Sequence, residues 1–108
     1  VVNAEGRRFY DEGEDFWPKR YAIWGRLVAQ QPGSIAYSIL DAKVSDKFMP
    51  SVFPAITAPT LTELAQKLGL NPEHVTYTVS QYNDAVRQGT FDHGVMDDCR
   101  TDGLTPPK

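Results

Sequence analysis

The sequence predicts a small α+β domain with an antiparallel or mixed sheet, one long helix and a C-terminal helical hairpin. Two stretches, residues 1–12 and 34–41, alternate apolar and polar side chains as strands do. Three others, residues 17–31, 60–69 and 71–89, place apolar side chains along one helix face. With 108 residues the chain forms one domain at most.

Composition and charge exclude several classes of protein. The net charge of −3 gives no electrostatic support to nucleic-acid binding, so no nucleic-acid partner is expected. The single cysteine, Cys99, excludes an intrachain disulfide and is typical of a reducing compartment. No apolar run approaches about 18 residues, so no transmembrane helix is predicted.

The opening residues predict a tight β-hairpin. Val1–Asn3 and Arg7–Tyr10 are the expected strands, and Gly6 closes the turn with a positive φ. The two-residue period of a strand places Phe9 on the core side and, on the opposite side, Arg8, Tyr10 and Glu12.

An acidic run from Asp11 to Asp15 is interpreted as a solvated loop before a helix, whose N-terminus favours carboxylates. The helix is expected from Trp17 to Gln31, with Pro18 in its first turn. Its apolar stripe is interpreted as core or as contact surface for a partner domain, and lining of a ligand cleft stays open as an alternative. The stripe consists of Trp17, Tyr21, Trp24, Leu27 and Val28.

The next stretch predicts a strand followed by irregular chain. Ser34–Asp41 alternates and is expected to pair with the opening hairpin, which gives a sheet of three or more strands. Ala42–Phe48 predicts a short helix or turn. Met49–Pro59 contains three prolines, which exclude a regular helix or a central strand.

Two short helices are predicted to form the helical hairpin. Thr60–Glu63 is a capping box that starts the first helix, and Gly69 ends it. Asn71 caps the second helix, and Gly89 is expected to end it. The faces expected to point inward carry Leu61, Leu64, Ala65 and Leu68 in the first helix and Val75, Val79, Tyr82 and Val86 in the second.

Residues 90–108 show no periodicity and are interpreted as a connection to parts outside this chain. The chain as a whole is expected to be a fragment of a longer protein. Asp92, His93 and Asp97–Cys99 are metal-ligand residue types, but their spacing matches no familiar site, so no metal is predicted. The sequence also lacks a phosphate-binding glycine-rich loop, a dinucleotide fingerprint and a recognisable Ser-His-Asp arrangement.

Four motifs follow one another along the chain. Residues 2–12 match V-N-x-x-G-x-R-F-x-x-E, residues 31–41 are similar to Q-x-G-x-x-A-Y-x-I-x-D, residues 60–69 to T-L-x-E-L-A-x-K-L-G, and residues 82–92 to Y-N-x-A-x-x-x-G-x-F-D. The ordered set resembles the substrate-capping domain of the FAD-dependent fumarate reductase, succinate dehydrogenase and 3-ketosteroid dehydrogenase superfamily. Within it, Ser38–Lys43, Phe48–Pro54 and Thr90–Pro106 are most similar to tricarballylate dehydrogenases.

This resemblance implies that residues 1–108 form one capping domain, which closes over FAD held by the FAD-binding domain of the same chain. The expected reaction converts tricarballylate, a tricarboxylate, to cis-aconitate with hydride transfer to flavin N5. The fragment alone is expected to hold no FAD and to be inactive. The resemblance also implies a cytoplasmic enzyme, peripheral at the inner face of the membrane through a membrane-bound electron-transfer partner.

The resemblance assigns few site residues. Glu12 matches the glutamate that relays protons in fumarate reductases, and Arg8 is expected to be structural, paired with nearby carboxylates. Residues 13–16 lack the arginine that follows this glutamate, and residues 43–45 lack the catalytic arginine, so the Arg–Glu–Arg relay is not reproduced. This pattern favours a dehydrogenase. Lys43 and Lys47 are candidates for contacting substrate carboxylates, with solvated surface as the alternative.

Two other interpretations stay open. Within the family, the chain could be the cap of a fumarate reductase or of a 3-ketosteroid dehydrogenase. Outside it, the chain could be a stand-alone α+β interaction module whose Trp17, Tyr21 and Trp24 face binds a protein.

Overall fold

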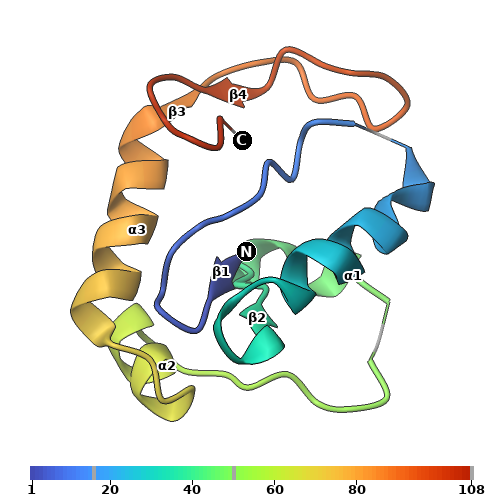
Figure 1. The fold of residues 1–108 in the computed structure, drawn as a ribbon. Coiled ribbons are helices and arrows are strands. Elements are labelled where there is room, and N and C mark those ends of the chain that lie inside the picture. Colours follow the sequence, from blue (N-terminus) through green and yellow to red (C-terminus); the bar gives the residue numbers. More distant parts are fainter. Residues whose placement is uncertain (16, 50, 108) are drawn as a thin grey trace.

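The computed structural model describes residues 1–15, 17–49 and 51–107, and its α+β architecture confirms the predicted fold class. In Figure 1 the opening segment runs through the middle of the molecule, with α2 and α3 on one side and α1 on the other. The elements, with 3-10 helices labelled η, are β1 (Val2–Asn3), η1 (Pro18–Arg20), α1 (Tyr21–Ala29), η2 (Pro32–Ser34), β2 (Ala36–Tyr37), η3 (Ala42–Lys47), α2 (Leu61–Lys67), α3 (Pro72–Ala85), β3 (Val86–Arg87) and β4 (Arg100–Thr101).

The described strands form two antiparallel pairs, β1 with β2 and β3 with β4. Val2 lies opposite Tyr37 and also bridges to Arg8. The predicted opening hairpin is therefore present as a turn with a single bridge. The predicted sheet of three or more strands is wrong, because the chain leaves the ladder after Arg8.

The turn at Gly6 docks the opening segment onto α3. Gly6 has a φ of +75°, which confirms the sequence prediction. The Asn3 side chain accepts hydrogen bonds from the backbone N–H groups of Glu5 at 3.0 Å and Arg7 at 3.1 Å. The Thr78 hydroxyl donates to the Gly6 carbonyl at 2.7 Å. This hydrogen bond joins the opening turn to α3.

A small apolar core lies between the turn and the helical hairpin. Its buried members are Val2, Ala65, Leu70 and Val75, with Tyr37, Ile39 and Leu68 packed against them. The prediction that Phe9 anchors the core is wrong, because Phe9 is half-buried whereas Tyr10 is only 8% exposed. Tyr10 meets the Trp24 ring edge-on at 4.6 Å between centroids. Strand alternation does not apply here, since residues 9–12 form no regular strand.

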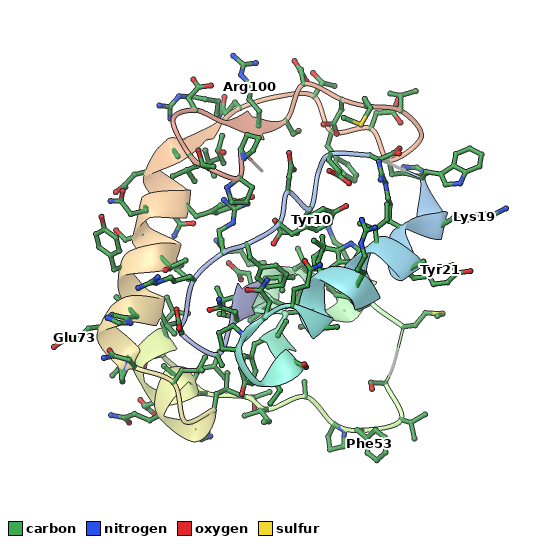
Figure 2. All side chains as sticks on the ribbon, viewed as in Figure 1. Tyr10, Lys19, Tyr21, Phe53, Glu73 and Arg100 are labelled. Atoms are coloured by element: carbon green, nitrogen blue, oxygen red, sulfur yellow. The ribbon has the colours of Figure 1, made fainter. Side chains whose placement is uncertain are left out.

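The first predicted helix forms with shorter bounds, as η1 followed by α1. The described part of α1 contains no fully buried residue. The interpretation of the stripe as core is wrong for Trp17 and Tyr21, which are 53% and 75% exposed, and Figure 2 shows Tyr21 pointing away from the body. Trp24 is half-buried.

The acidic run is not simply a solvated loop. Arg20, which ends η1, pairs with Glu14 at 3.1 Å and with Asp15 at 2.8 Å. The predicted loop before the helix is confirmed and Glu14 is exposed, but both carboxylates also pair with Arg20 ahead of α1.

The second predicted strand is shorter than Ser34–Asp41. Ser34 belongs to η2 and has a φ of +54°, which is not an extended conformation. Ile35 is 47% exposed, so it does not share an inward face with Tyr37 and Ile39. The short helix predicted after the strand is confirmed as η3. The irregular stretch to residue 59 is confirmed too, except that Pro50 lies outside the described residues.

The helical hairpin is confirmed. The Thr60 hydroxyl accepts from the Glu63 N–H at 3.2 Å and donates to the Glu63 carboxylate at 3.2 Å. Asn71 accepts from the first-turn N–H groups of α3. However, α3 ends at Ala85, before the predicted stop at Gly89, and Val86 is the first residue of β3. Val86 is 46% exposed, so its predicted inward position is wrong.

The C-terminal residues return to the body of the molecule. β4 pairs with β3, and the Asp102 N–H donates to the Ala85 carbonyl at 2.9 Å. The prediction of a structureless segment over residues 90–108 is therefore wrong at Arg100–Thr101. In the part of the chain that is described, no helix combines the length and apolar character that crossing a membrane requires.

Replacement of Gly6 tests the docking of the turn. Gly6→Ala should lower the free energy of unfolding by about 1–2 kcal/mol, the usual penalty for a left-handed alanine. The added Cβ would also lie only 3.1 Å from Val75 Cγ2. The matched control is Gly25→Ala in α1, where an added Cβ meets nothing within 4 Å, and it should stabilise by about 0.5–1 kcal/mol. Urea unfolding measures both; equal effects would contradict the docking.

Candidate functional site

A groove of about 740 Å³ lies between the opening segment, the chain after β2 and the helical hairpin. The opening segment supplies Arg8 and Glu12, and residues 38–42 and 58–61 supply two walls. α3 contributes Thr78, Val79, Tyr82 and Asn83. This volume is in the range of about 300–1,000 Å³ typical of small-molecule pockets.

A second, more open hollow of about 430 Å³ adjoins the groove on the α1 side. Trp24 and Val28 line it, so part of the predicted stripe does face a hollow, whereas Trp17 and Tyr21 are not among its described lining residues. Val1, Glu12 and Ser38 line both spaces. Glu12 thus stands at the boundary between the two hollows.

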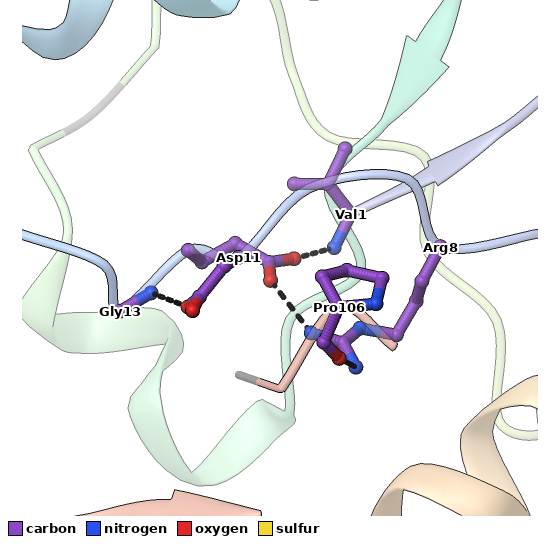
Figure 3. Close-up of polar contacts among 6 residues, drawn as sticks. Val1, Arg8, Asp11, Gly13 and Pro106 are labelled. Atoms are coloured by element: carbon purple, nitrogen blue, oxygen red, sulfur yellow. Dashed lines mark hydrogen bonds and ion pairs between the residues drawn. The ribbon is translucent and has the colours of Figure 1, made fainter. Parts of the chain in front are cut away.

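Arg8 fixes the geometry of this boundary. Its side chain is 11% exposed, and its two terminal nitrogens donate to Glu12 Oε2 and to the Pro106 carbonyl, each at 3.1 Å. Its guanidinium lies 4.7 Å from the centroid of the Tyr82 ring, a cation–π contact. Figure 3 shows the polar contacts of Arg8, and its ion pair agrees with the expected pairing with a nearby carboxylate.

The carboxylate of Glu12 has a cationic partner, because its Oε2 pairs with Arg8. The Glu12 side chain is nevertheless 32% exposed, so water and small ligands can reach it. A carboxylate held in one orientation at the edge of a groove can accept or deliver a proton. Its participation in a reaction stays a prediction.

The two predicted lysines lie elsewhere. Lys43 and Lys47 belong to η3 and are exposed, and neither is among the described residues that line the two hollows. Asp41 starts η3 by accepting from the Lys43 N–H at 2.8 Å. Their contact with substrate carboxylates stays a prediction, and the geometry places them beyond the groove edge.

Sequence reasoning missed the groove residues Ser38 and Asn83 as site residues, and it assigned Tyr82 only to an inward helix face. The helical period does predict that Tyr82 faces inward. Nothing in the local sequence predicts that Arg8 covers its ring, because the two residues are far apart in the chain.

Tyr10 has a pKa that is shifted from its ordinary value. Burial raises the pKa of Tyr10 to about 12, and its hydrogen bond to the Glu14 carboxylate acts in the same direction. Tyr10 is not among the described residues that line either hollow.

The described residues contain no group of three or more His, Cys, Asp and Glu side chains that could hold a metal ion. In the loop between β3 and β4, Asp98 accepts from the Thr90 N–H at 2.6 Å, and Asp97 accepts from the Asp92 N–H at 2.9 Å. The aspartates singled out in the sequence therefore organise the backbone of their own loop.

Distant relatives connect this chain to oxidoreductases. It is similar to 3-oxosteroid 1-dehydrogenases of Mycolicibacterium smegmatis and Mycobacterium tuberculosis, at 28% identity over 107 residues, which covers 82% of this chain and 19% of each relative. It is also similar to NADH:acrylate oxidoreductase of Vibrio harveyi, at 29% identity over 98 residues, which covers 82% of this chain and 9% of the relative. No family model and no solved structure matches the chain.

The chain thus spans less than a fifth of the length of these relatives, and the similar region is a segment of oxidoreductases with different names. The similarity supports the part of the superfamily resemblance that predicts a segment of an oxidoreductase. Neither name is that of a tricarballylate dehydrogenase.

Arg8→Gln tests whether the contacts of Arg8 support the fold. The change should cost about 2 kcal/mol of unfolding free energy, because it removes an ion pair from a largely buried position and a cation–π contact. The matched control is Arg7→Gln. Arg7 is 70% exposed and pairs with Glu5 at 3.5 Å, so the change should cost less than about 1 kcal/mol. Similar losses in both variants, measured by urea unfolding, would contradict a central role for Arg8.

The raised pKa of Tyr10 predicts a loss of stability at alkaline pH. The folded-state pKa of about 12 exceeds the ordinary tyrosine pKa of about 10, so the stabilisation is complete below pH 10 and disappears as the pH rises toward 12. Ultraviolet titration of tyrosinate should show one of the five tyrosines ionising last, and Tyr10→Phe should remove that step. Tyr77→Phe, at a 66% exposed position, is the control and should leave it unchanged.

Proposed function

We propose that this chain is the substrate-capping part of an FAD-dependent oxidoreductase. The observation that carries the proposal is the similarity of 82% of the chain to short segments of two differently named oxidoreductases. The groove beside Glu12 supports it, because it offers an oriented carboxylate next to a ligand-sized space.

The described residues do not fit FAD by themselves. Phosphates are usually bound by free N–H groups at a helix N-terminus, but Thr60 caps α2 and Asn71 caps α3 with their side chains. The groove cation Arg8 is already engaged by Glu12 and the Pro106 carbonyl. The proposal therefore assigns the cofactor to another part of the protein, and the 108-residue chain alone should show no turnover.

Within this function, two substrates compete. Tricarballylate, oxidised to cis-aconitate, is favoured by the stretches that resemble tricarballylate dehydrogenases, and electrons would then pass to a membrane-bound partner. A 3-oxosteroid is favoured by the names of the mycobacterial relatives. In either case Glu12 is the proposed proton carrier, held in place by Arg8.

A stand-alone interaction module is the second candidate, because Trp17 and Tyr21 present exposed rings on the α1 side. The two proposals differ in a simple observable. A capping segment works only as part of a flavoprotein, whereas an interaction module binds its partner without any flavin.

The test is anaerobic titration of the intact protein. It should contain flavin, and its visible absorbance should bleach when the true substrate is added. Glu12→Gln should slow this reduction by about 10²–10⁴-fold, the usual contribution of a positioned acid–base group. Glu73→Gln, an exposed glutamate that points away from the body in Figure 2, is the matched control and should reduce at the original rate. Absence of flavin would refute the proposed function.

A further inference from the structure

We infer that an exposed apolar patch between η3 and α2 is a permanent contact surface, which the remaining part of the same polypeptide covers in the intact protein. The apolar patch consists of Phe48, Met49, Val52, Phe53 and Ile56. The inference rests on the proposed function, which assigns the cofactor to another part of the protein, and it names the surface that this other part contacts.

The apolar patch stands almost fully in water. Met49 and Val52 are 92% and 93% exposed, and Phe53 is 79% exposed. Figure 2 shows Phe53 at the outer edge of the molecule. The five side chains come from residues 48–56, so they are close together along the chain. Soluble monomers rarely leave contiguous apolar surface of this kind uncovered, and such a patch marks an interaction site.

The composition of this stretch is that of the centre of an interface. Residues 48–59 contain no Asp, Glu, Lys or Arg. The centres of protein interfaces are depleted in charged residues and enriched in aromatic residues and methionine. The apolar patch supplies two phenylalanines and a methionine, whereas a loop that remains in water usually carries polar and charged side chains.

Polar contacts hold the stretch without using its apolar side chains. Lys67 of α2 donates from Nζ to the Thr57 carbonyl at 2.6 Å, and Thr60 caps the first turn of α2. The Phe53 N–H donates to the Ser51 hydroxyl at 3.3 Å. These backbone contacts leave the rings and aliphatic groups of the apolar patch to a partner.

The accessible surface of the chain is larger than that of a self-contained protein of its mass. It amounts to 7999 Å². A folded monomer of 12.1 kDa exposes about 6,000 Å². The excess of roughly 2,000 Å² is the size of one side of a permanent interface, which removes about 1,000–2,500 Å² from each partner. A contact of standard size removes only about 800 Å² from each partner. The excess therefore favours a permanent contact.

The comparisons favour the same polypeptide as the source of the covering surface. The matched segment is 19% of the 3-oxosteroid 1-dehydrogenase relative and 9% of the NADH:acrylate oxidoreductase, so each relative has a remainder several times longer than this segment. A covering surface in the same polypeptide is present at any protein concentration, as a permanent contact requires.

The charges beside the apolar patch do not suit a lipid surface. Lys43 and Lys47 of η3 are balanced by Asp46 and by Asp41, which caps η3. Segments that dock on membranes surround their apolar side chains with an excess of lysine and arginine. The balanced charge therefore favours a protein surface.

Oxidation by hydrogen peroxide tests the inference in the intact protein, with peptide mapping of the two methionines. The rate of methionine oxidation to the sulfoxide follows exposure. Met49 should be oxidised about ten-fold more slowly than Met96, which lies outside the apolar patch in the loop between β3 and β4. Their exposed fractions here, 92% for Met49 and 53% for Met96, predict the opposite order if nothing covers the patch. Equal or faster oxidation of Met49 would overturn the inference.

The conditions of protection identify what covers the apolar patch. Protection by the same polypeptide should not change on dilution and should need no lipid. Protection that disappears on dilution would assign the patch to a second copy, and protection that requires phosphatidylglycerol vesicles would assign it to a membrane. Either result would overturn the inference. Flavin content is measured on the same sample. Absence of flavin refutes the proposed function, whereas unprotected Met49 in a protein that contains flavin refutes the contact surface alone.

Two aspartate substitutions provide a matched pair. Phe53→Asp buries a charge in the proposed contact, so it should raise the rate of Met49 oxidation by about ten-fold. Phe53 is 79% exposed in this chain, so the change leaves the core around Val75 intact. Tyr77→Asp replaces an aromatic residue of α3 that is 66% exposed, and it should leave the rate unchanged. Equal rates in the two variants would overturn the inference.

Discussion

The Arg8 side chain makes the contacts on which the groove depends. It reaches the opening segment through Glu12, the C-terminal residues through the Pro106 carbonyl and α3 through the face of Tyr82. A largely buried guanidinium is stable only where its donors are matched, and here the partners are Glu12, four residues along the chain, and two distant parts of the chain. The same contacts orient Glu12 between the two hollows. The ion pair therefore joins the fold to the proposed chemistry.

Around this ion pair the apolar core is small. Val75 is the largest side chain that is fully buried among the described residues, and the Gly6 turn packs directly on it. Much of the local order comes instead from polar caps. Thr60 and Asn71 cap the first turns of α2 and α3, and the Asn3 side chain stabilises the first turn of the chain. Arg20 forms ion pairs with two carboxylates that precede α1. Such caps and turns are specified by a few adjacent residues, whereas core packing depends on distant ones.

This difference explains what the sequence could predict. Gly6, the capping box at Thr60 and the Asn71 cap follow local rules, so the turn and the helical hairpin are as expected. Strand lengths, the burial of Tyr10 instead of Phe9 and the return of the chain at β4 depend on tertiary contacts, which periodicity does not encode. For the site, motif resemblance drew attention to Glu12. The contacts of Arg8 with the Pro106 carbonyl and the Tyr82 ring emerge only in the folded chain.

The central claim is that the groove beside Glu12 is where the substrate of a flavin-dependent oxidoreductase binds. The most direct measurement is a structure of the intact protein with a bound ligand. The ligand should lie in the groove against Val79 and Tyr82, with Arg8 still paired to Glu12. A ligand bound away from the groove would contradict it.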